Sequence, residues 1–114
     1  MLNFSLSEKQ KDGVEYRLEY LPFDNNSFDT VFVVGAWEVV LQPSYALLEL
    51  FRITSKTLII CYRTGSRLPW QTIQMEDEKS WKDFTQSIKV VMPNNFKKIS
   101  NDYSAVIWNN LNGN

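Results

Sequence analysis

Two short apolar runs separated by a helical pattern constrain the fold of this 114-residue chain more than any other feature. Residues Phe28–Val34 and Thr57–Tyr62 are rich in β-branched and aromatic residues, which is typical of strands buried on both faces. Between them, Pro43–Ile53 carries apolar residues at helical spacing, including Tyr45 and Leu48. Two parallel strands need a crossover connection of this kind. The sequence therefore predicts a central βαβ unit with helices above and below the sheet.

The segments on either side of this unit predict further parts of one sheet. Val14–Tyr20 alternates apolar and charged residues, which predicts a half-exposed edge strand. Glu76–Ser87 has the apolar spacing of a second helix, and Phe96–Ser100 with Tyr103–Asn109 predicts an antiparallel hairpin. A chain of this length suffices for one domain, so we expect a single α/β domain over residues 1–114.

Composition excludes several classes of function. The chain has no histidine and one cysteine, Cys61, which argues against a zinc site, a catalytic triad and an internal disulfide. Twelve basic and 13 acidic residues give a net charge of -1, so there is no electrostatic signal for nucleic acid. There is no apolar run of membrane-spanning length and no signal peptide, which predicts a cytoplasmic protein.

An ordered series of motifs begins in the loop before the first apolar run. Leu21–Val31 reads Leu-Pro-Phe-Asp-Asn-Asn-Ser-Phe-Asp-Thr-Val, followed by Trp37–Val40, Gln42-Pro43 and the helix segment Ala46–Ile53. In order and spacing this series resembles the type 11 branch of the class I S-adenosylmethionine-dependent methyltransferases. The resemblance implies a partial Rossmann-like methyltransferase sheet, with the βαβ unit at its centre and the hairpin at its far end.

The resemblance also implies a cofactor site that this chain carries only in part. In the family, a glycine-rich turn approaches the amino-acid part of the cofactor and a carboxylate holds the ribose, both supplied by the first half of the domain. The four glycines here form no Gly-x-Gly, and Arg17 stands where the family has an acid near the adenine. We therefore expect a domain truncated at its cofactor-binding half. The remaining candidate cofactor contacts are Glu19, Leu21, Gly35, Ala36, Trp37 and Glu38.

Three functions remain open. The first is a methyltransferase-like structural or interaction module, without catalytic activity or cofactor when alone. The second is an S-adenosylmethionine-dependent methyltransferase whose site is completed by another subunit. The third is an unrelated small α/β module that binds a ligand through Trp37, Trp70 and Trp81. No catalytic residue and no metal site stand out, and Glu49 with Arg52 has the spacing of an ordinary surface ion pair.

The expected partner is a second copy of the chain or a complementing protein chain. Without the strands of the missing half, the edge of Phe28–Val34 would carry unpaired amides and carbonyls. Either Val14–Tyr20 covers this edge within one chain, or two chains form a homodimer, which we favour, by pairing through the edge or by exchanging the N-terminal segment.

Overall fold

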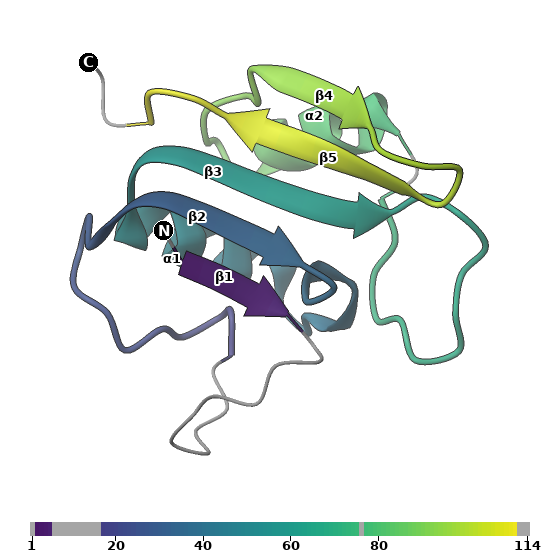
Figure 1. The fold of residues 1–114 in the computed structure, drawn as a ribbon, viewed down its shortest axis with the longest axis horizontal. Coiled ribbons are helices and arrows are strands. Elements are labelled where there is room, and N and C mark those ends of the chain that lie inside the picture. The colour runs from purple at the N-terminus through teal and green to yellow at the C-terminus, as the bar shows by residue number, and fades with distance from the viewer. Residues whose placement is uncertain (1, 6–16, 76, 112–114) are drawn as a thin grey trace.

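The computed structural model describes residues 2–5, 17–75 and 77–111, which form one five-stranded sheet with two helices (Figure 1). The strand order is β1-β2-β3-β5-β4. The elements are β1 (Leu2–Ser5), β2 (Phe28–Val34), the 3₁₀ turn η1 (Trp37–Val39), α1 (Pro43–Ile53), β3 (Thr54–Arg63), α2 (Glu78–Ser87), β4 (Asn95–Lys98) and β5 (Tyr103–Trp108). This mixed α/β architecture is the Rossmann-like arrangement that the sequence predicts.

The central βαβ unit is confirmed. Strands β2 and β3 pair in parallel and α1 connects them, with Pro43 in its first turn, where a missing N–H costs no helical hydrogen bond. The helix buries Ala46, Leu47, Leu50 and Ile53 against the sheet. The apolar face of α1 was predicted too wide. Its outward-facing residues Tyr45 and Leu48 are 60% and 45% exposed.

The edge of β2 is covered by a strand that the sequence analysis missed. Strand β1 pairs in parallel with β2, from Leu2 opposite Val31 to Ser5 opposite Val34. The prediction of a strand over Val14–Tyr20 is wrong for Arg17–Tyr20, which forms a tight turn closed by Tyr20 N–H donating to Arg17 O at 3.1 Å. Residues 14–16 lie outside the described part. The edge predicted to be bare is therefore paired within the chain.

Both helices lie on the same side of the sheet, behind it in Figure 1. We call this side the covered face; its residues Val31, Val33, Leu58, Ile60, Val106 and Trp108 are all 0% exposed. The opposite side, which we call the open face, carries the alternate residues Thr30, Phe32, Val34, Thr57, Ile59, Cys61, Ala105 and Ile107. No helix of the described residues packs on it. The prediction of helices above and below the sheet is therefore wrong for the described chain.

The C-terminal part closes the covered side. Helix α2 is capped by Asp77, whose carboxylate accepts a hydrogen bond from Ser80 N–H at 2.9 Å. Its buried Trp81 packs against Tyr62 of β3 and Trp108 of β5, at ring-centroid distances of 5.3 and 5.8 Å. The predicted hairpin is confirmed as β4 and β5. Within the described residues, neither helix is long and apolar enough to cross a bilayer.

Candidate site at the ends of the parallel strands

The candidate site lies where the parallel strands end. Because β1, β2 and β3 run in one direction, their carboxyl ends lie side by side at one end of the sheet. Ligands bind at this position in open α/β folds. Strand β2 leaves this end of the sheet through Gly35, whose φ of 72° is strained for any residue with a Cβ. Gly35 and Ala36 are half-buried and lead into η1. The structure therefore brings together four of the six predicted cofactor contacts, residues 35–38.

Glu38 connects three segments at this end of the sheet. The residue is 2% exposed, and its Oε1 accepts a hydrogen bond from Arg63 N–H, at the end of β3, at 2.7 Å. Its backbone carbonyl accepts from Thr72 N–H at 2.8 Å, in the loop that follows β3. The other carboxylate oxygen, Oε2, is buried and has no hydrogen-bond partner among the described residues. Burial raises the pKa of the Glu38 carboxyl above its usual value, although Arg63 opposes this shift.

Trp37 belongs to the core. It is 1% exposed, and its ring centroid lies 5.1 Å from that of Trp81 and 6.2 Å from that of Phe84. These contacts join η1 to α2. Trp70, the third tryptophan of the predicted ligand-binding set, is 50% exposed in the loop after β3. The two buried rings, Trp37 and Trp81, pack against each other at an interplanar angle of 34°, which is the arrangement of core aromatics rather than of a ligand pocket.

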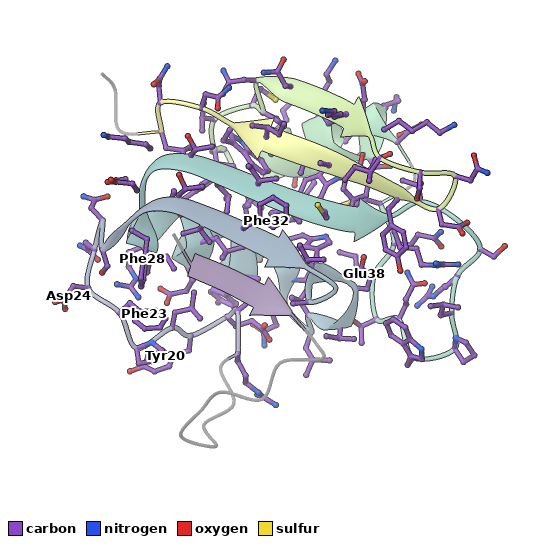
Figure 2. The ribbon with its side chains drawn as sticks, viewed as in Figure 1. Tyr20, Phe23, Asp24, Phe28, Phe32 and Glu38 are labelled. Atoms are coloured by element: carbon purple, nitrogen blue, oxygen red, sulfur yellow. The ribbon has the colours of Figure 1, made fainter. Side chains whose placement is uncertain are left out.

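Leu21 lies in a different place, in the loop before β2, where its backbone contacts side chains of helix α1. Its N–H donates to Glu49 Oε2 and its carbonyl accepts from Arg52 Nη2, both at 2.9 Å. Figure 2 shows Tyr20, which precedes Leu21, on the side of Phe28 at the start of β2, whereas Glu38 lies beyond the end of that strand. Glu19 is half-buried in the turn before Tyr20. The structure thus separates Glu19 and Leu21 from the four residues at the strand ends.

Glu49 and Arg52 form a clamp on the loop that carries the family motif, rather than the ordinary surface pair that was predicted. Arg52 Nε donates to Glu49 Oε1 at 2.7 Å, and Arg52 Nη1 donates to Phe23 O at 2.7 Å and to Asn25 Oδ1 at 3.0 Å. The hydrogen bond from Arg52 lowers the pKa of Glu49. The three-residue spacing signalled the pair, but nothing in it signalled the distant backbone partners.

A pocket of about 340 Å³ lies between the end of β3, the start of α2 and the β4–β5 hairpin, and none of the six predicted cofactor contacts lines it. It is open to solvent, and Tyr62 forms part of its wall, where burial raises the pKa of the Tyr62 hydroxyl. The lining residues are Tyr62, Thr64, Asp77, Glu78, Phe96, Lys97, Lys98, Asn101 and Ser104. Asp77 is occupied as the helix cap, so this pocket offers no catalytic constellation. The described residues contain no group of three acidic, histidine or cysteine side chains placed to hold a metal ion.

Two solved structures share this fold. The fold is similar to the crystal structure of a SAM-dependent methyltransferase from Aquifex aeolicus, with a TM-score of 0.61 and 14% identity. It is also similar to a SAM-dependent methyltransferase, possible histamine N-methyltransferase, from Thermotoga maritima, with a TM-score of 0.60 and 17% identity. These alignments cover 83% and 88% of this chain, which spans 52% and 66% of those proteins.

No curated protein sequence matches the chain significantly. The family model described as "Methyltransferase domain", type 11, matches residues 1–60, which is more than half of the chain and includes the loop, β2, α1 and most of β3. The chain therefore belongs to the methyltransferase domain family.

Proposed function

We propose that this chain is a methyltransferase-like module that acts through interaction and does not transfer methyl groups by itself. The observation that carries the proposal is the use of Trp37 and Glu38. Trp37 packs on Trp81, and Glu38 holds the end of β3 through Arg63 N–H. Both side chains, which the resemblance assigns to the cofactor, serve the packing of the fold. A cytoplasmic, reducing setting, expected from the sequence, is part of this proposal.

The residues present fit S-adenosylmethionine only in part. Gly35 and Ala36 are half-buried, so their backbone can approach a ligand. A ribose diol, however, requires a carboxylate that can reach it, and Glu38 points into the protein. The chain also has no Gly-x-Gly turn for the amino-acid part of the cofactor. The residues of this chain alone therefore do not make a complete site for the cofactor.

A second candidate function is a methyltransferase completed by another subunit. The observation in its favour is the half-buried turn of Gly35 and Ala36, which lies where three parallel strands end, the usual ligand position in open α/β sheets. In this alternative the other subunit supplies the glycine turn and the ribose carboxylate, and S-adenosylmethionine is the cofactor.

Calorimetric titration of the purified chain with S-adenosylmethionine and with S-adenosylhomocysteine tests the proposal. We expect no binding tighter than about 100 μM, equivalent to about 5.5 kcal/mol. A matched control is the variant Gly35→Val, which alters the half-buried turn at the end of β2. Tighter binding by the natural chain that Gly35→Val abolishes would contradict the proposal and favour the enzyme.

A further inference from the structure

The open face is an apolar surface without a covering layer among the described residues. Ile59 and Ile60 are neighbours on β3, and only Ile60, on the covered face, is fully buried. On the open face Phe32, Ile59 and Ile107 are half-buried and Val34 is 42% exposed, whereas the smaller Cys61 and Ala105 between them are 7% and 4% exposed. Figure 2 shows Phe32 on the side of the sheet away from the helices. Central parallel strands are normally covered on both faces, so this surface calls for a partner.

The register of the sheet orders this surface into two adjacent rows. Phe32, Ile59 and Ile107 lie side by side across β2, β3 and β5, and we call them the large row. Toward the carboxyl ends of β2 and β3, two residues from the large row, lie Val34 and Cys61, and Ala105 of the antiparallel β5 lies beside Cys61; we call these three residues the small row. On each of the three strands a larger and a smaller side chain therefore occupy neighbouring positions of the same face.

We propose that two copies of this chain pack their open faces together as a two-fold dimer. The two-fold axis would run parallel to the two sheets, midway between them and perpendicular to the strands. It would pass between the large row and the small row. This rotation places the large row of one copy over the small row of the other. Ile59 then faces Cys61, Ile107 faces Ala105 and Phe32 faces Val34. Such interdigitation is how two packed sheets fill the space of about 10 Å between them.

The charges at the rim fit the same rotation. Lys97 lies beside Ala105 at the end of the small row, and Asn95 lies beside Ile107 at the end of the large row. The rotation therefore brings Lys97 opposite Asn95 instead of opposite a second lysine. Arg63 comes opposite Thr57, and its guanidinium is already held by Ser66 O at 2.8 Å. A net charge of -1 gives little repulsion between copies.

The size of the surface predicts a weak dimer. Five strands about 4.8 Å apart and about six residues long give a face of roughly 500 Å² per copy. Two such faces bury about 1,000 Å², near the lower limit for a specific interface. We therefore expect dissociation in the micromolar range, with monomers at low concentration. This inference does not rest on the proposed function, because cofactor titration and self-association are measured separately.

Sedimentation velocity over a series of protein concentrations tests the dimer. We expect a monomer–dimer equilibrium, weakened at least about tenfold by Ile59→Lys, because a charge would be buried without a partner. The matched control is Leu48→Lys on the outer side of α1, where the side chain is 45% exposed, and it should leave the equilibrium unchanged. Circular dichroism checks that each variant is folded.

A pair of substitutions on β5 tests the exchange of rows and does not depend on the folding of Ile59→Lys. Ala105→Ile places two large residues opposite each other, and Ile107→Ala leaves a gap, so each should weaken the dimer. The double variant exchanges the large and small positions and should restore it. A chain that stays monomeric at the highest concentration would overturn the proposal, even if another protein covers this face. A dimer unaffected by Ile59→Lys, or a double variant no stronger than the single ones, would also overturn it.

Discussion

The two faces of the sheet differ in what stabilises them. The covered face has α1 and α2 packed on it, and its central residues are fully buried. Its layer is also braced by polar contacts, with Arg52 holding the loop before β2 and Glu38 holding the end of β3. The open face has comparable apolar residues on β3 but no such layer among the described residues. The same strand thus presents one side to an interior and the other to a potential partner.

The largest effect is expected from truncating the covered face. Ile60→Ala should lower the free energy of unfolding by about 2–5 kcal/mol, because it opens a cavity under the helices. Ile59→Ala removes the same atoms from the preceding residue of β3, on the open face, where the described residues enclose no cavity. At low protein concentration its loss in the free energy of unfolding should therefore be clearly smaller than that of Ile60→Ala. Urea unfolding of both variants measures the difference, and equal costs would break the distinction between the faces.

The clamp on the loop is expected to contribute less. Arg52→Ala removes the donors to Leu21 O and Phe23 O, and hydrogen bonds from a charged group contribute about 1.5–3 kcal/mol. We expect a loss near the lower end, since the Arg52 side chain is 31% exposed. The matched control is Lys79→Ala, which breaks only an exposed pair with Asp83 on α2 and should lower stability far less. Similar losses in both variants would show that the loop contacts add nothing.

The smallest effects concern two carboxylates whose pKa shifts have opposite signs. The raised pKa of Glu38 means that its contribution to stability is present below the unfolded pKa and is lost as the pH rises through the folded pKa. Glu38→Gln should therefore gain stability relative to the natural chain as the pH rises from acid to neutral. The lowered pKa of Glu49 gives the reverse: its contribution is present above the unfolded pKa and lost as the pH falls.

Thermal unfolding of both variants from acid to neutral pH checks these signs. Glu49→Gln should lose stability relative to the natural chain mainly at neutral pH. If both substitutions changed the pH profile in the same direction, burial of Glu38 would not be the cause of its shift.

The βαβ unit could be predicted because its apolar runs and the proline-initiated helix all favour one arrangement. The one-sided layering could not, because Ile59 and Cys61 make β3 read as apolar on both faces. Strand β1 was missed because four residues carry too little pattern, and the alternation over Val14–Tyr20 was misleading because a local turn forms at Arg17–Tyr20.

The candidate site, like the fold, could be predicted only in part. The turn at Gly35 could be located as the exit of a strand, and the structure gives it a positive φ. The structural roles of Trp37 and Glu38 depend on their contacts with α2 and with the loop after β3, which lie far away in sequence. Neighbouring residues in the sequence could not indicate those partners. The role of Arg52 was missed for the same reason.

The stability cost of Ile59→Ala as a function of protein concentration tests most directly the claim that the described residues of one chain cover only one face of the sheet. Association stabilises the folded state by mass action, so an interface contact contributes only where copies associate. We expect the free energy of unfolding of Ile59→Ala to lie only slightly below that of the natural chain in dilute solution, and the difference to grow with protein concentration. For Ile60→Ala the difference should be large at every concentration. An Ile59→Ala cost that is as large as that of Ile60→Ala in dilute solution, and constant with concentration, would contradict the account.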